Sequence, residues 1–114
     1  MLESLFQAID NKDPVKFSEF LTEDCKFKFG NLPVVNGIRY IQEFVSGFFD
    51  SIKDLSHEIY EHWEVPGGLI CHGVVTYTRK DGSQLIIPFA NILKTESGKI
   101  YDYSIFVDAS ELYK

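Results

Sequence analysis

Three short glycine-bearing segments divide the second half of the chain, and their spacing restricts the fold more than any other feature. They are Pro66-Gly67-Gly68, Lys80-Asp81-Gly82-Ser83 and Glu96-Ser97-Gly98. Each has the length and composition of a hairpin loop. Between and around them lie four segments with strand character, roughly 56–65, 69–79, 84–95 and 99–108. Consecutive hairpins predict an antiparallel meander, and strands of about ten residues predict a sheet that twists and curls.

The first half of the chain predicts helices. Apolar residues recur at helical spacing over Leu2–Ile9, after Asp13-Pro14, and from Asn36-Gly37 to about Ile52. Between the second and third helix, the alternating segment 25–29 predicts a strand that turns Cys25, Phe27 and Phe29 toward the core. Helices followed by strands, without βαβ alternation, indicate an α+β fold. We expect a single domain spanning residues 1–114.

Charge and cysteine content exclude several classes of protein. The net charge of −6 argues against a nucleic-acid partner, since such surfaces are basic. No apolar run approaches the roughly 20 residues that span a bilayer, and the N-terminus lacks a basic leader, so we expect no membrane partner. Cys25 and Cys71 are predicted to be free thiols in a reducing compartment, with a single disulfide as the alternative. The expected location is therefore cytoplasmic.

The three histidines suggest no metal centre. Together with the acids nearby, His57, His62 and His72 fit no compact ligand motif, so we expect no metal site and no cofactor.

The last predicted strand carries carboxylates on an otherwise apolar segment. Alternation from Ile100 places Asp102, Ser104, Phe106 and Asp108 on one face. An unpaired buried carboxylate is too costly to be kept for packing alone. The strand is therefore predicted to line a cavity or to end at a rim, and Asp108 becomes the first candidate functional residue.

The order of elements resembles the nuclear transport factor 2 (NTF2)-like superfamily, and within it the SnoaL-like polyketide cyclase group. The resemblance covers nearly the whole chain. It is carried by the run Leu21–Phe27, by Asn36-Gly37 followed by Ile41 and Phe44, and by Gly98-Lys99-Ile100 leading to Phe106-Val107-Asp108. It implies a cystatin-like α+β cone, in which a curved antiparallel sheet wraps around three N-terminal helices and leaves a conical pocket for small molecules.

The resemblance also implies roles for single residues. In the cyclases and in limonene epoxide hydrolase, the Asp that falls at Asp108 acts as an acid or base. The hydrolase pattern would also place an Arg at His72 and an Asp at Val74. Ketosteroid isomerases would need an Asp near Phe29 and a Tyr near Leu5. The chain has none of these four, so neither activity is predicted.

A different acid–base pair is predicted instead. The resemblance turns the face that carries Ile70, His72 and Val74 toward the pocket, so His72 would lie beside Asp108 and act as a general base. The alternative is a histidine and an aspartate with structural partners at the sheet rim. The other expected pocket residues are Phe27, Phe29, Phe48, Trp63, Val74, Asp102, Ser104 and Phe106. Tyr77, Tyr101 and Tyr103 would then lie on the outer face, which relatives bury in a homodimer.

Two functions follow from this interpretation. The first is a small-molecule-binding enzyme, cyclase-like or isomerase-like, that acts on a small apolar carbonyl compound with Asp108 and His72. The second is a non-catalytic ligand-binding or dimerisation domain. A cavity of a few hundred Å³ that reaches both side chains would favour the first. Aromatic side chains that fill the cavity would favour a structural role.

Overall fold

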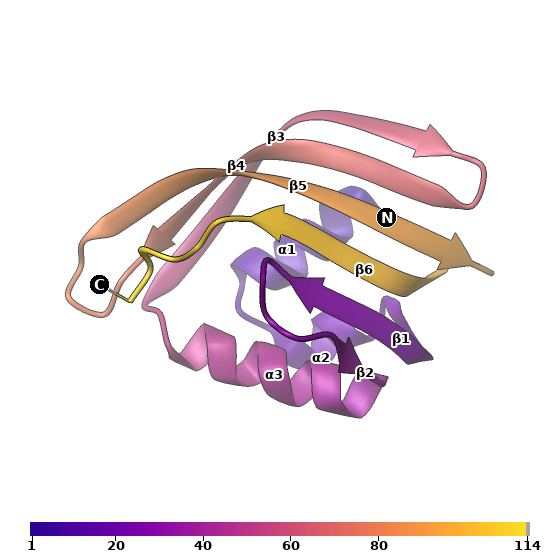
Figure 1. The fold of residues 1–114 in the computed structure, drawn as a ribbon, viewed down its shortest axis with the longest axis horizontal. Helices are drawn as coiled ribbons and strands as arrows, with labels where there is room; N and C mark the ends of the chain where they lie inside the picture. The colour runs from indigo at the N-terminus through magenta and orange to yellow at the C-terminus, as the bar shows by residue number, and fades with distance from the viewer. Residues whose placement is uncertain (114) are drawn as a thin grey trace.

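A computed structural model describes residues 1–113 and has three N-terminal helices on one side of a curved sheet (Figure 1). This confirms the predicted α+β class. None of the helices in the described part is long and apolar enough to cross a membrane. The helices are α1 (Leu2–Asp10), α2 (Pro14–Ser18) and α3 (Ile38–Asp50), and the strands are β1 (Leu21–Phe29), β2 (Val35–Asn36), β3 (Asp54–Val65), β4 (Gly68–Thr78), β5 (Gln84–Glu96) and β6 (Lys99–Val107).

The sheet has the strand order β2-β1-β6-β5-β4-β3. The predicted antiparallel meander is present as β3 to β6. One pair differs from the prediction: β1 and β6 run parallel, with Phe27 opposite Tyr103, so the sheet as a whole is mixed. No local pattern could predict this pair, because its two strands lie far apart in the sequence.

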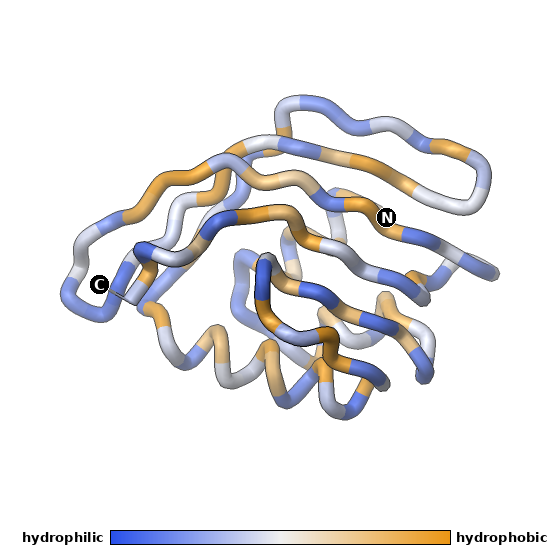
Figure 2. The backbone as a smooth tube through the Cα atoms, in the orientation of Figure 1, coloured by the Kyte–Doolittle hydropathy of each residue, from blue (hydrophilic) through white to orange (hydrophobic). Residues whose placement is uncertain are grey.

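The concave face of the sheet carries the core, and β4 shows which side chains face it. Cys71, Val75 and Tyr77 are buried, whereas His72 and Val74 between them are partly exposed. The predicted facing of this strand is therefore wrong. Hydrophobic residues occur along much of β4 (Figure 2), and the outer face also carries Ile70 and Val74, so alternation could not decide which side is buried. A shift of one residue reverses every side chain of a strand.

Two bulges change the alternation of the neighbouring strands. On β3 the pairing with β4 shifts between Ile59 and Glu61, so Tyr60 is an extra residue. On β6 the pairing with β5 shifts between Ile100 and Asp102, so Tyr101 is an extra residue. An extra residue makes the side chains that follow it change faces. If side chains are assigned to alternating faces across Tyr60 or Tyr101, every residue after the bulge is therefore assigned to the wrong face of the sheet.

Proline cannot donate to a β-ladder, so the sequence predicts a bulge or a locally unpaired position at Pro88 of β5. The structure has no bulge there. Pro88 keeps the regular register, opposite Val74 of β4. On its other side β6 has ended at Val107, which lies opposite Phe89, so no β6 residue faces Pro88. The ladder is therefore unpaired on one side of Pro88 only, and the bulges occur elsewhere.

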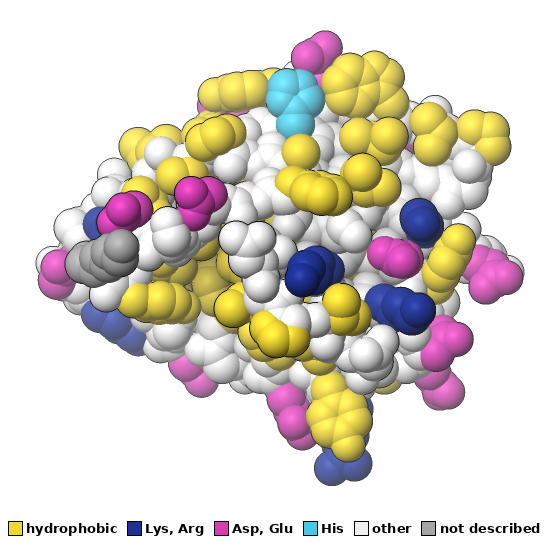
Figure 3. Space-filling model, in the orientation of Figure 1, with side chains coloured by type: hydrophobic (Ala, Val, Ile, Leu, Met, Phe, Trp, Pro, Cys, Tyr) yellow, Lys and Arg dark blue, Asp and Glu magenta, His cyan; other side chains and the backbone are white. Residues whose placement is uncertain are grey.

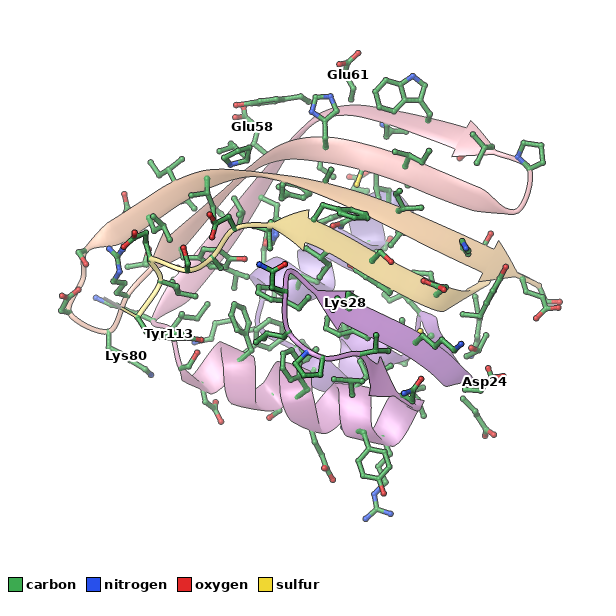
Figure 4. The ribbon with its side chains drawn as sticks, viewed as in Figure 1. Asp24, Lys28, Glu58, Glu61, Lys80 and Tyr113 are labelled. Atoms are coloured by element: carbon green, nitrogen blue, oxygen red, sulfur yellow. The ribbon has the colours of Figure 1, made fainter. Side chains whose placement is uncertain are left out.

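The segment after β6 is attached to the sheet by Arg79. Its Nε donates to the carbonyl oxygen of Leu112 at 2.9 Å, and its Nη2 donates to that of Glu111 at 2.9 Å. Leu112 is buried in the core. The hydroxyl of Tyr113 lies 2.7 Å from Ser51 Oγ at the end of α3 (Figure 4). The C-terminal segment therefore connects β4 with α3.

Candidate functional site

A small aromatic cavity lies between the concave face of the sheet and the helices. Its volume is about 50 Å³. Ligand pockets usually measure about 300–1,000 Å³, and 50 Å³ corresponds to one or two water molecules. The family-based prediction of a pocket is correct in place, but side chains fill most of it. Ten aromatic residues contribute: Phe6, Phe17, Phe27, Phe29, Phe44, Phe48, Phe49, Tyr77, Phe89 and Tyr103.

An acid–base pair that the sequence did not reveal lies beside this cavity, with its histidine in the lining. His57 of β3 has its Nδ1 2.6 Å from Oδ1 of Asp10, the last residue of α1. The backbone N–H of His57 donates to the other carboxylate oxygen at 3.0 Å. The His57 side chain is 10% exposed, and its ring centroid lies 4.9 Å from that of Phe6 and 5.1 Å from that of Phe89. Aspartate and backbone together fix the orientation of the ring.

The loop after α1 helps to bring the pair together. Lys12 Nζ donates to the carbonyl oxygens of Ile52 and Lys53, each at 3.1 Å, which attaches this loop to the start of β3. In the sequence, Asp10 looked only like part of a helix-ending segment. Because 47 positions separate Asp10 from His57, no local spacing could have identified them as partners.

The geometry suits a general base. An Nδ1–H that donates to a carboxylate leaves Nε2 as the acceptor of the neutral imidazole. Within residues 1–113, Nε2 of His57 has no hydrogen-bond partner. Phe6 and His57 line the cavity and also an open groove of about 580 Å³ between α1 and β3. The His57 ring therefore stands between the groove and the cavity.

The predicted base, His72, lies on the convex side of the sheet. Its Nε2 is 3.0 Å from Oε1 of Glu61, and its ring stacks on Trp63 with centroids 5.9 Å apart. Figure 4 shows Glu61 on the side of β3 that faces away from the helices. His72, Trp63 and Val74 consequently do not line the cavity, and their predicted placement is wrong. The inverted facing of β4 and the extra residue Tyr60 explain the errors.

The polar residues of β6 also point outward. The Ser104 hydroxyl donates to Asp102 at 3.4 Å, Phe106 is exposed, and the inward positions belong to Tyr103 and Ile105. None of Asp102, Ser104 and Phe106 lines the cavity, because the bulge at Tyr101 reverses the alternation.

Asp108 does not lie in the cavity either. It follows β6, is exposed, and accepts the backbone N–H of Ser110 at 3.1 Å. Neither Asp108 nor His72 lines the cavity, so the predicted arrangement of this pair inside the pocket is wrong. Of the predicted lining residues, Phe27, Phe29 and Phe48 line the cavity.

Burial keeps the thiols and phenols of the core neutral. It raises the pKa of Cys71 to about 11 and, with the charges of Asp102 and Asp24 adding to the effect, that of Cys25 to about 12. Burial also raises the pKa of Tyr77 and Tyr103 well above 10.0. Both cysteines are free, which excludes the disulfide alternative. No cluster of three or more His, Cys, Asp or Glu in residues 1–113 could hold a metal ion.

These pKa values predict a loss of stability in alkaline solution. In the unfolded chain the thiols ionise near their ordinary pKa of 9.0, whereas the folded chain keeps the proton of Cys71 to about pH 11. The stability that these protonated groups contribute is fully present below about pH 9, and it is lost as the pH rises through their pKa values in the folded protein. We expect the free energy of unfolding in urea to fall by about 1.4 kcal/mol per pH unit for each such group. Tyr103→Phe should make the fall less steep, and an equally steep fall would contradict the assignment to Tyr103.

Comparison with known proteins shows which proteins this chain resembles. Residues 2–103 match the model of the SnoaL-like domain family. No curated protein sequence matches the chain. An NTF2-like protein of unknown function from Burkholderia pseudomallei shares 14% identity, with 97% of this chain and 90% of that chain covered and a TM-score of 0.87.

Two further solved structures carry names that suggest activities. A protein described as a candidate polyketide cyclase from Xanthomonas campestris pv. campestris is 15% identical, with 97% of this chain and 90% of that chain covered and a TM-score of 0.87. An LEH-like epoxide hydrolase from M. tuberculosis is 11% identical, with 98% and 83% covered and a TM-score of 0.82. At these identities the similarity shows the NTF2-like fold alone.

Proposed function

Because the chain belongs to the SnoaL-like domain family, which includes polyketide cyclases and isomerases, we propose that it is an acid–base enzyme acting on a small apolar carbonyl compound. In this proposal His57 and Asp10 replace the pair expected from the sequence. The observation that supports it is the 2.6 Å contact between His57 Nδ1 and Asp10 Oδ1 beside the aromatic cavity. A histidine oriented by a carboxylate is a common arrangement for moving protons.

The proposed reaction begins with removal of a proton from the carbon next to the carbonyl group. His57 Nε2 accepts that proton, Asp10 stabilises the resulting imidazolium, and the carbonyl compound becomes an enolate. Tyr77 lines the same cavity, and its raised pKa keeps it protonated, so its hydroxyl is available to donate to the enolate oxygen. His57 then returns the proton to carbon in an isomerisation, or to the new alkoxide in a ring closure.

The groove between α1 and β3 provides room for the body of the substrate. Its volume of about 580 Å³ falls within the usual range for ligands, whereas the cavity of about 50 Å³ does not. His57 and Phe6 line both spaces. A substrate in the groove would therefore present its reactive carbon to His57 without having to enter the filled cavity as a whole.

Proton exchange tests the proposal without knowledge of the natural substrate. With 2-tetralone in D₂O, the protein should accelerate replacement of the protons next to the carbonyl by deuterium, followed by NMR. The control is free imidazole at the same concentration. A rate no higher than that of imidazole would argue against proton abstraction from ketones of this class.

A second function, homodimerisation through the convex face of the sheet, is supported by the aromatic residues on it. Tyr60, Trp63, Ile92, Tyr101 and Phe106 are between 39% and 60% exposed. Hydrophobic side chains gather beside a histidine on the face seen in Figure 3. Apolar patches of this kind mark interaction surfaces. Of the three tyrosines expected there, Tyr101 is exposed, but Tyr77 and Tyr103 are wrong because both lie buried in the core.

We expect Trp63→Glu to abolish the dimer. Trp63 stacks on His72 within this patch, and a carboxylate buried in an apolar interface has no partner there. Sedimentation velocity should show a dimer for the wild type, and a dissociation constant at least about 100-fold higher for the variant. Tyr40→Glu on α3, at an aromatic position that is more exposed than Trp63, should leave the dimer unchanged. A monomeric wild type at high micromolar concentration would refute this function.

A further inference from the structure

One buried polar atom in the cavity wall has no partner. Asn91 lies on the concave face of β5 and is 2% exposed. Its Oδ1 is the one buried side-chain nitrogen or oxygen atom without a hydrogen bond in the part of the chain that the structure describes. An acceptor in this state has lost its water without gaining a donor, and native proteins rarely keep such an atom without a reason.

The sheet neighbours of Asn91 offer no adequate donor. Across the sheet it lies between Cys71 of β4 and Ile105 of β6. A protonated thiol is only a weak donor, and isoleucine has none. The adjacent inward residues of its own strand, Phe89 and Leu93, are buried hydrophobic residues. No group in the described part of the chain donates to Oδ1, so a water or a ligand is needed to supply a donor.

The cavity leads to Asn91 and connects it with the proposed base. Asn91 and His57 both line the cavity, with Phe89 in contact with the His57 ring. The lining of the cavity therefore contains both the proposed base, His57, and an acceptor without a donor, Asn91 Oδ1. The rest of the lining is mainly aromatic, which suits a ring compound.

We infer that Asn91 Oδ1 accepts a hydrogen bond from a ligand hydroxyl, so that the ligands of this site are hydroxylated ring compounds, phenolic or enolic, rather than plain hydrocarbons. The inference rests on the proposed function, because it assumes that the aromatic cavity receives part of the substrate. Aromatic side chains must move for a ring to reach Asn91, since the space now measures about 50 Å³. Asn91 would then select the ligand, while His57 performs the chemistry.

A pair of probes that differ in one group tests the inference. Phenol carries the hydroxyl, and toluene has a methyl group in its place. We expect Asn91→Leu, which keeps the approximate shape and removes the acceptor, to lower the preference for phenol over toluene about tenfold in NMR titrations. Asn31→Leu, the same substitution at an exposed loop position outside the cavity, is the matched control and should leave the preference unchanged. A preference unaffected by Asn91→Leu would overturn the inference.

Stability without ligand gives a second, independent measurement. If the acceptor is unpaired in the free protein, Asn91→Leu should raise the midpoint of thermal unfolding, by roughly 4 °C. A lower midpoint would show that a buried water already satisfies Oδ1, and would overturn the inference. If Asn91→Leu does not fold, Asn91→Ala tests the phenol preference in the same way.

The two proposals fail separately. The phenol preference is a binding measurement and does not depend on proton exchange. Suppose that the wild type prefers phenol, that Asn91→Leu lowers this preference, and that the wild type does not accelerate proton exchange from 2-tetralone. This result would refute the enzymatic function and support the role of Asn91. If proton exchange depends on His57 but Asn91→Leu leaves the preference for phenol unchanged, the enzymatic function is supported and the role of Asn91 is refuted.

Discussion

Replacing His57 with alanine should reduce the acceleration of proton exchange from 2-tetralone by about 10²- to 10⁴-fold, the usual contribution of a general base. The ring is the group proposed to receive the proton, and its Nδ1 is already fixed by Asp10 at 2.6 Å. The loss should fall on kcat, with little change in KM, because most of the substrate would contact the groove. NMR exchange rates at several ketone concentrations separate the two constants.

Asp10→Asn tests whether the carboxylate sets the tautomer of the ring. The new amide can donate to Nδ1, which would move the ring proton to Nε2 and remove the base, so we expect a loss of about 10²-fold or more. His72→Ala is the matched control, because His72 pairs with Glu61 on the convex face and should not affect exchange. If His72→Ala abolished exchange and His57→Ala did not, the pair assigned here would be incorrect.

Substituting alanine for Gly73 should destabilise the protein by about 3 kcal/mol or more. Gly73 lies opposite Ile59, next to the β3 bulge, where even a Cβ atom would overlap the backbone carbonyl oxygen of Glu58. Backbone cannot move aside as a flexible side chain can, so the bulge itself would have to distort. Urea unfolding followed by circular dichroism measures the effect.

Gly47→Ala provides the control for this prediction. Gly47 lies within α3, and nothing stands within 4 Å of a Cβ atom built there. Alanine in an open helical position is favoured over glycine by about 0.5–1 kcal/mol, so this variant should be slightly more stable than the wild type. Similar destabilisation by both substitutions would show that the close approach at Gly73 has no special role.

Local features of this chain were predictable from its sequence. Asp13 caps α2 by accepting the N–H of Lys16 at 2.9 Å, as the Asp13-Pro14 pair indicated. The hairpin loops lie at the predicted glycines. Gly67, Gly82 and Gly98 adopt positive φ values there, which glycine does without steric cost. Helix periodicity, caps and turns depend on neighbours in the sequence, so the sequence alone specified them.

The site was less predictable, because its residues are arranged by long-range contacts. Extra residues at Tyr60 and Tyr101 reverse the faces of β3 and β6 partway along each strand, and alternation does not show where such bulges occur. The carboxylate and the imidazole come from the end of a helix and the third strand. Their meeting depends on how α1 crosses β3, which no motif in this chain encodes.

The parallel pairing of β1 with β6 has a consequence for biosynthesis. The β6 partners of residues 21–29 lie at positions 100–105, so β1 remains unpaired on that edge until the ribosome has synthesised β6. During this interval Phe27 and Phe29 have no sheet neighbour to cover them on that side. A nascent chain that has not yet released β6 from the ribosome would therefore expose apolar surface and be prone to aggregation.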